Sequence, residues 1–64
     1  MKVTEIPEGQ SVVIKECNHK HLLEHGFTPN TEIEIYKKYS NIICFSIRGT
    51  RIAVRNNECE YIKI

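Results

Sequence analysis

Aspartate and tryptophan are absent from this chain, and only 8% of its 64 residues are aromatic. Without an aspartate, a Ser-His-Asp triad cannot be formed, because the base of such a triad is held by that third group. The glutamates that could form acid pairs fall on the expected solvated faces of strands: Glu32, Glu34, Glu58 and Glu60. We therefore expect that the protein is not an enzyme.

A surplus of either charge is also missing, since nine lysines and arginines stand against eight acidic residues, for a formal charge of +1. That charge is too small to hold a phosphate backbone across a broad surface. We do not expect nucleic acid as a partner.

Long apolar runs and a cysteine framework are lacking as well. The longest apolar runs, residues 12–14 and 42–45, are too short to cross a bilayer, and the polar N-terminus does not form a signal-peptide core. Three cysteines are an odd number without the dense paired spacing of secreted domains. Cys44 and Cys59 show no spacing that lowers a thiol pKa, so we expect both as small buried residues. These features favour a cytoplasmic protein without membrane insertion.

The chain is rich in β-branched residues. Hydrophobic residues make up 41% of it, and many are valines and isoleucines in alternating order, which favours strands over helices. After a lead-in segment at 1–6, strands are predicted at residues 11–17, 31–39, 42–47, 51–55 and 61–64. A chain of 64 residues has room for a single domain, residues 1–64.

One short helix is predicted between the first and second strands, at residues 19–25. Asn18 is expected as its N-cap, and Gly26 as the residue with positive φ past its C-terminus. Pro29 and Asn30 suit the second and third positions of the next turn, where Asn30 would take a positive φ.

Closing the five strands into a small, partly closed β-barrel would remove most of the strand edges that so short a chain cannot otherwise protect. The connections fit, since 40–41 and 48–50 are predicted as tight turns and 56–60 as a turn or 3₁₀ segment. The apolar phase of each alternating strand predicts one core. Its members are Ile33, Ile35, Ile43, Phe45, Ile47, Ile52, Val54 and Ile62.

One cysteine and all three histidines lie around the predicted helix: Cys17, His19, His21 and His25. Thiolate and imidazole groups are ligands for Zn²⁺ or Fe²⁺, and His21 and His25 would share one helical face. Against a metal site, Cys17 ends a strand, no Cys-x-x-Cys pair is present, and Lys20 adds a positive charge. The plainer interpretation makes Cys17 a core residue and the histidines a solvated helix face. We expect no cofactor and at most weak binding of Fe²⁺ or Zn²⁺.

Two small basic clusters lie beside aromatic residues. They comprise Tyr36, Lys37, Lys38 and Tyr39 in one segment, and Arg48, Arg51 and Arg55 in another. Small barrels bind single-stranded nucleic acid through such mixtures, but a solvated hairpin tip that discourages edge pairing is the plainer interpretation. A third interpretation is a contact surface for another protein, because tyrosine and arginine are common at the centre of such surfaces.

A series of short motifs follows in a fixed order: a leucine pair, Gly-Phe-Thr-Pro, an alternating strand, Gly-Thr-Arg-Ile-Ala-Val-Arg, a short acidic segment and a terminal strand. The positions that carry it are Leu22, Leu23, Gly26, Phe27, Pro29, Gly49, Ile52, Ala53, Val54, Arg55, Glu58, Ile62 and Ile64. In this order and spacing the chain resembles the FeoA family over essentially its whole length. Asn30 stands where that family usually has glycine.

The resemblance implies an SH3-like β-barrel and an accessory protein of bacterial ferrous iron uptake. Such a protein would act in the cytoplasm through contact with the cytosolic GTP-binding part of the membrane transporter FeoB, and not through chemistry of its own. The alternative is a small carrier or sensor that binds a transition metal through the cysteine and the three histidines. Weak self-association is left open.

The partner surface is predicted at two places, the corner between the helix and the following strand, and the tip of the hairpin around residue 39. Leu22 and Leu23 are adjacent on one short helix and cannot both face the core, so at least one should be partly exposed beside Phe27. The predicted contact residues are Leu22, Glu24, His25, Phe27, Pro29, Lys37, Lys38 and Tyr39.

Overall fold

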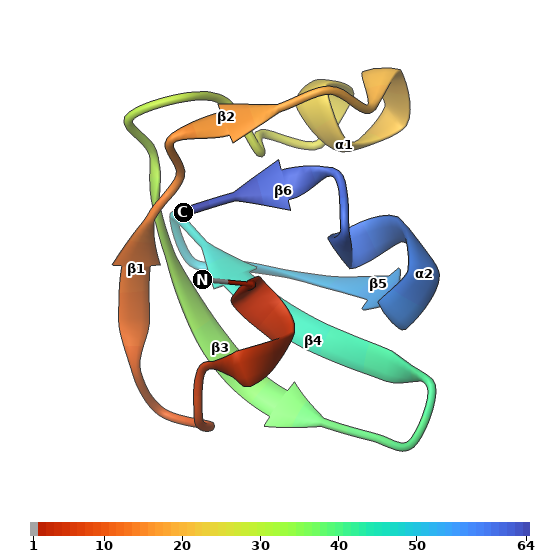
Figure 1. Ribbon diagram of the computed structural model, residues 1–64. Helices are drawn as coiled ribbons and strands as arrows, with labels where there is room; N and C mark the ends of the chain where they lie inside the picture. Colours follow the sequence, from red (N-terminus) through yellow and green to blue (C-terminus); the bar gives the residue numbers. More distant parts are fainter. Residues whose placement is uncertain (1) are drawn as a thin grey trace.

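The computed structural model describes residues 2–64, which form six strands, two short α-helices and one 3₁₀ helix (Figure 1). In chain order these are η1 (Val3–Glu5), β1 (Ser11–Val13), β2 (Glu16–Cys17), α1 (Lys20–Glu24), β3 (Glu32–Lys38), β4 (Ile42–Ile47), β5 (Thr50–Arg55), α2 (Asn56–Cys59) and β6 (Ile62–Lys63). The predicted lead-in segment contains η1, while Met1 lies outside the described residues. Over this range, every helix is too short and too polar to span a lipid bilayer.

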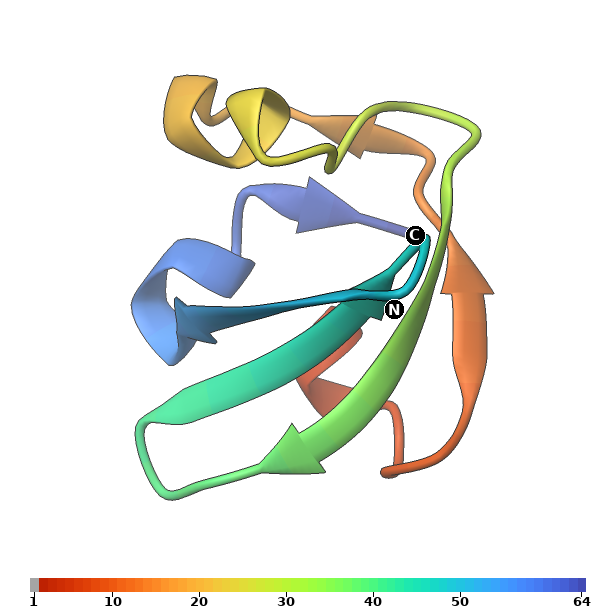
Figure 2. The same ribbon diagram turned by 180° about the vertical axis from the view of Figure 1, so that it is seen from behind.

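The strands form two antiparallel sheets. The larger sheet has the order β1-β3-β4-β5, and the smaller one pairs β2 with β6. An isolated bridge between Lys2 and Lys63 extends the small sheet toward the N-terminus. Because β5 has a strand partner on one side only, the barrel is not fully closed, as the sequence predicted (Figures 1 and 2).

The predicted first strand at 11–17 is in fact two strands, which is why the fold has six and not five. The main chain changes sheets between them. The amide of Ile14 donates to the carbonyl of Thr31 at 2.9 Å, on the side of the large sheet, and the next amide, that of Lys15, donates to the carbonyl of Lys63 at 2.7 Å. Strand pairing is therefore interrupted where the chain switches from one sheet to the other.

A β-bulge interrupts the predicted alternation of β3. Ile35 pairs with Phe45, but the next paired residues are Lys37 with Cys44, so Tyr36 is the extra residue. A bulge reverses which residues face inward. Lys37 is therefore exposed on the outer face, whereas Lys38, predicted as a contact residue, is turned partly inward.

Helix α1 is shorter than predicted and begins after His19, which has no side-chain capping bond, so Asn18 is not the N-cap. The C-terminal signal is confirmed. Gly26 has a φ of 105°, its amide donates to the carbonyl of Leu23, and the amide of Phe27 donates to that of Leu22. This is the Schellman arrangement, in which the residues at its two ends, here Leu22 and Phe27, are commonly apolar and in contact.

The turn predictions hold, with one correction. Asn30 has a φ of 69°, as predicted, and the β4–β5 hairpin turns through Arg48 and Gly49, with φ values of 52° and 84°. Two successive positive values are typical of a type I′ turn. The segment expected as a turn or 3₁₀ helix at 56–60 forms the α-helix α2 over its first four residues.

The core contains every predicted member, although Ile52 is only partly buried against it. It also contains residues that alternation did not identify: Val3, Ile6, Ile14, Cys17, Leu22, Phe27 and Cys59. Phe27 and Phe45 are fully buried, and their rings meet edge to face with centroids 5.4 Å apart. Of the three cysteines, Cys44 is only half-buried, contrary to our expectation.

Candidate contact surface

The corner formed by α1 and the following turn exposes one apolar side chain of the pair predicted there. Leu22 is 4% exposed and belongs to the core, whereas Leu23 is 37% exposed. Phe27, a predicted contact residue, is also buried, because it completes the cap of α1. Leu23 therefore replaces Leu22 and Phe27 in the predicted surface, and Glu24, His25 and Pro29 remain exposed beside it in the sequence.

The β3–β4 hairpin carries the second predicted part. Tyr39 is 58% exposed, and Lys37 is exposed on the outer face of the sheet. Lys38 has a structural role instead. Its amide donates to a carboxylate oxygen of Glu8, and its Nζ donates to the carbonyl of Thr4 at 2.8 Å. These bonds hold the N-terminal segment against the hairpin, so Lys38 is not a free charge for a partner.

These two parts of the predicted surface do not meet. In both views α1 lies at one end of the molecule and the tip of the β3–β4 hairpin at the other (Figures 1 and 2). Next to the hairpin tip, a shallow hollow of about 520 Å³ is lined by Asn41, Ile42, Arg55, Asn56 and Asn57. Each part must therefore be tested as a separate contact area.

The outer face of the large sheet bears an ordered basic side chain. The guanidinium of Arg51 on β5 lies 3.9 Å from the ring centroid of Tyr36, the bulged residue of β3. Such cation–π stacking holds an arginine in one orientation while leaving its N–H groups open to solvent. Arg55 lies on the same face of β5, with the small Ala53 between them, and all three are exposed.

A groove of about 150 Å³ separates α1 from β5. Leu22, Ile52 and Val54 supply its apolar lining, together with Ala53, and His21, His25 and Glu58 supply polar atoms. In both views α1 lies on the side of β5 that faces away from β4 (Figures 1 and 2). The groove thus follows the edge of β5 that has no strand partner.

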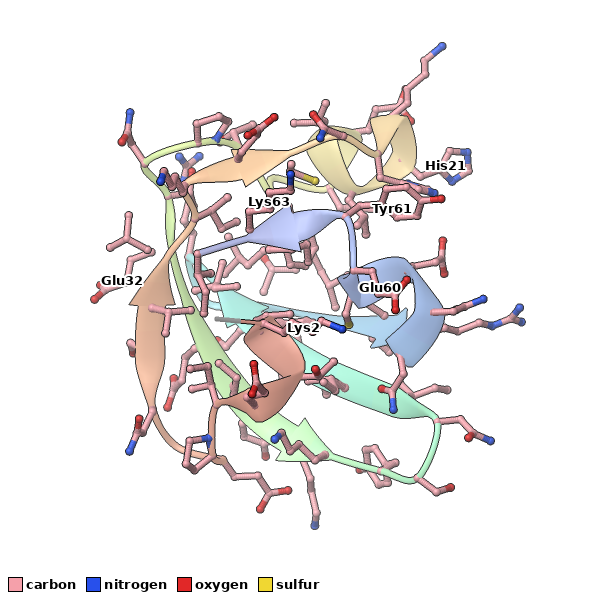
Figure 3. All side chains as sticks on the ribbon, in the orientation of Figure 1. Lys2, His21, Glu32, Glu60, Tyr61 and Lys63 are labelled. Carbon is pink, nitrogen blue, oxygen red and sulfur yellow. The ribbon has the colours of Figure 1, made fainter. Side chains whose placement is uncertain are left out.

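The four residues predicted as metal ligands do not come together in one site. The thiol of Cys17 is buried and donates to the carbonyl of His19 at 4.0 Å. The Nε2 atom of His19 lies 3.5 Å from a carboxylate oxygen of Glu58, and its ring packs against Tyr61, with centroids 5.0 Å apart. His21, shown with Tyr61 at this corner in Figure 3, lines the groove. Within residues 2–64, no three cysteine, histidine or acidic side chains are grouped so that they could hold a metal ion.

Cys59 is 1% exposed at the end of α2. Burial, together with the negative charge of the adjacent Glu58, raises the pKa of Cys59 to about 11. The thiol is thus held in its protonated, unreactive form at neutral pH. This agrees with its prediction as a small buried residue.

Comparisons with known proteins agree with the sequence pattern. The family model of the FeoA domain matches residues 1–64. The fold is similar to a crystal structure described as iron uptake regulatory protein (FeoA), with a TM-score of 0.84 and 19% sequence identity over 97% of this chain and 91% of that one. At such identity the likeness shows the fold alone, and it confirms the predicted SH3-like barrel. A search of curated proteins found no match.

Proposed function

This chain belongs to the FeoA family, and from that premise we propose that it regulates ferrous iron uptake in the cytoplasm by binding the cytosolic GTP-binding part of a FeoB transporter. The family is associated with ferrous iron uptake, and the similar crystal structure is described as an iron uptake regulatory protein. The match of the family model over residues 1–64 is the observation that carries the proposal. Regulation would act through contact and not through a reaction at this domain.

The surface supports a role in protein contact. Leu23 on α1 and Tyr39 on the β3–β4 hairpin are large side chains that solvent reaches, at 37% and 58% exposure. Burying an exposed leucine or tyrosine against a partner is favourable, and such residues often dominate the binding energy. Leu23 therefore takes the place of Leu22 as the side chain to be tested at the helical corner.

Binding of the purified GTP-binding part of a FeoB transporter from the same organism tests this proposal. Leu23→Asp should dissociate about tenfold faster than wild type, because loss of one buried leucine removes roughly 1.5 kcal/mol. Lys37→Glu should mainly slow association and change its salt dependence. Val13→Asp is the matched control, because Val13 is 54% exposed on β1 and outside the proposed contact areas.

The outcomes separate the surface from the partner. If Leu23→Asp and Lys37→Glu remain folded and bind like wild type, the proposed contact areas are wrong. If wild type does not bind the transporter fragment, with or without guanine nucleotide, the proposed partner is wrong.

The alternative, a metal-binding carrier or sensor, receives less support from the side-chain arrangement. Cys17 faces the core, and His19 lies near both Glu58 and the ring of His21, but within residues 2–64 no three cysteine, histidine or acidic side chains are grouped so that they could hold a metal ion. A metal site needs preset ligands and partners that orient them. We expect anaerobic calorimetry with Fe²⁺ or Zn²⁺ under reducing conditions to give weak binding or none. Submicromolar binding at one ion per chain, abolished by His21→Ala, would favour the alternative.

A further inference from the structure

One edge of β5 is long and has no strand partner in the described part of the chain. β5 has six residues paired with β4, and no strand within residues 2–64 pairs along its other side. The opposite end strand of the same sheet, β1, has only three residues. Figure 2 shows β6, and α1 beyond it, on the unpaired side of β5, and neither pairs with β5. An unpaired edge presents a row of main-chain donors and acceptors to which another chain can add.

The register shows which main-chain groups face this edge. The amide of Asn56 donates to the carbonyl of Asn41 at 2.9 Å, so these residues form a hydrogen-bonded pair that continues the β4–β5 ladder. That ladder has no register shift. Because hydrogen-bonded and non-hydrogen-bonded pairs alternate in antiparallel sheets, the even-numbered residues of β5 bond to β4. The N–H and C=O groups of Arg51, Ala53 and Arg55 therefore point toward the free edge.

The exposed side chains at the same three positions indicate the charge of the occupant. A strand added to β5 would place its own side chains directly opposite Arg51, Ala53 and Arg55. The two arginines are four residues apart, which is about 13 Å along a strand. Arg51 stacks on Tyr36 of β3, on the side of β5 away from the free edge, so its guanidinium would leave that ring to meet an acidic side chain on an added strand. An acidic side chain opposite each arginine, and a small one opposite Ala53, would complement this row.

A second copy of this chain is a poor occupant. Antiparallel pairing of two β5 edges centred on Ala53 would place Arg51 of each copy directly opposite Arg55 of the other. Like charges in directly opposed positions are destabilising. The same arginines that would attract an acidic strand thus oppose self-association at this edge.

The groove beside the edge indicates what the inward side chains of the added strand should be. Its apolar part is formed by Leu22, Ile52 and Val54, and its volume of about 150 Å³ is of the size of one or two aliphatic side chains. Of the charged groups that line it, Glu58 lies close to His19, with 3.5 Å between their nearest side-chain nitrogen and oxygen. Aliphatic residues in the alternate positions would fit this lining.

From these observations we propose that the free edge of β5 binds an extended segment of a partner protein with the pattern acidic-aliphatic-small-aliphatic-acidic. The segment would add to the sheet antiparallel to β5, with its acidic side chains beside Arg51 and Arg55 and its aliphatic side chains toward the groove. This site goes beyond the proposed function and does not depend on the identity of the transporter.

A synthetic peptide, acetyl-Thr-Glu-Val-Ser-Val-Glu-Thr-amide, tests the proposal with the full isotope-labelled chain. We expect saturable shifts of the Arg51, Ala53 and Arg55 amide signals, and slower hydrogen exchange at the same three residues, because these donors become bonded. A peptide with lysine in place of both glutamates should bind at least about tenfold more weakly, since two attractive cross-strand pairs become repulsive. The double variant Arg51→Glu, Arg55→Glu should reverse this preference, and Arg48→Glu, a charge change in the turn, should keep it.

Methylation of peptide nitrogens separates strand addition from simple charge attraction. In the proposed register the serine N–H faces Ala53, whereas the valine N–H groups face away from β5. N-methylserine should therefore abolish binding, and N-methylation of the first valine, the third residue of the peptide, should weaken it much less.

Four results would overturn the proposal. The first two are equal binding of the glutamate and lysine peptides, and equal effects of the two methylations. The third is concentration-dependent shifts along β5 without peptide, which would indicate a second copy as the occupant. The fourth is no binding at all, which would mean that the arginines only keep the edge unpaired. Failure of the transporter fragment to bind would change none of these conclusions, because the peptide experiments do not use the transporter.

Discussion

The chain divides into the four-stranded sheet and a remaining part formed by η1, β2, α1, α2 and β6. Both parts contribute side chains to one core, but they differ in how much main-chain pairing holds them. β4 and β5 pair at six positions, whereas β2 and β6 pair at two. Yet side chains from both parts are equally buried, with Phe45 of β4 at 0% and Cys59 of α2 at 1% exposure. The sheet is therefore held by main-chain ladders and side-chain burial together, and the remaining part depends mainly on burial and caps.

The largest expected effect comes from the contact that joins the two parts. Phe45→Ala removes the ring that meets Phe27, and both rings are fully buried. We expect a loss of about 3–5 kcal/mol in the free energy of unfolding, measured by urea denaturation. This is a large share of the stability of a domain of this size. Tyr39→Ala, at an exposed site, is the control and should change the free energy of unfolding by less than about 0.5 kcal/mol. A urea denaturation curve of Phe45→Ala like that of wild type would contradict the assignment of this core.

A smaller loss in the free energy of unfolding is expected from a change in the C-terminal cap of α1. The part of the chain outside the large sheet has few paired strands and depends on such caps. A Cβ added at Gly26 would lie 3.7 Å from Cγ2 of Ile47, an ordinary contact, so space is not the obstacle. The obstacle is the φ of 105°, which an alanine rarely adopts. Gly26→Ala should therefore lower the free energy of unfolding by about 1–2 kcal/mol through backbone strain. Hydrogen exchange should show that the amides of His25 and Phe27 lose protection before those of β4. Lys20→Ala in the first turn of α1 is the control, and equal effects of both substitutions would argue against strain at Gly26.

The same contrast decides how much of the fold could be predicted from sequence. In the sheet, alternation placed Ile33, Ile35, Ile43 and Phe45 in the core correctly, because each strand there is buried on one face only. In the remaining part, elements of two to five residues are too short for a period to be seen. Burial of Val3 and Cys59 is set by packing between segments distant in sequence, which no local pattern shows.

Two errors arose where the chain changes phase. Ile14 and Cys17 are both buried, although they lie three residues apart, and this odd spacing is a signal of the break between β1 and β2 that alternation over 11–17 conceals. The bulge at Tyr36 likewise turns Lys38, which was predicted as a contact residue, partly inward. Of the predicted surface, the exposed residues of α1 and the hairpin tip could be found from sequence. The groove beside β5 could not, because it depends on which strands pair.

The thiol at the end of α2 offers a test of burial by pH. Its pKa is raised from the ordinary value of 9.0 to about 11, first by burial and then by the charge of Glu58. Because the folded state holds this proton more tightly, the contribution to stability is complete below pH 9 and is lost as the pH rises to about 11. Cys59→Ala should be less stable than wild type at pH 8, and the difference should narrow between pH 9 and 11. Urea midpoints of both proteins measure it, and a constant difference would mean that Cys59 is not buried as a thiol.

The smallest expected effects come from two turns, one in each part of the chain, that hold non-glycine residues at positive φ. Arg48, in the β4–β5 turn, has a φ of 52°, and Asn30, before β3, has a φ of 69°. Asparagine tolerates this region better than other non-glycine residues. Arg48→Asn should therefore stabilise the protein by about 0.5 kcal/mol, and Asn30→Arg should destabilise it by a similar amount. Both side chains are exposed, so packing changes little. Urea denaturation of the two single variants and of the double variant checks this, because the double variant should return close to wild type if the two turns act independently. Equal signs for the two substitutions would show that backbone conformation does not set the effect.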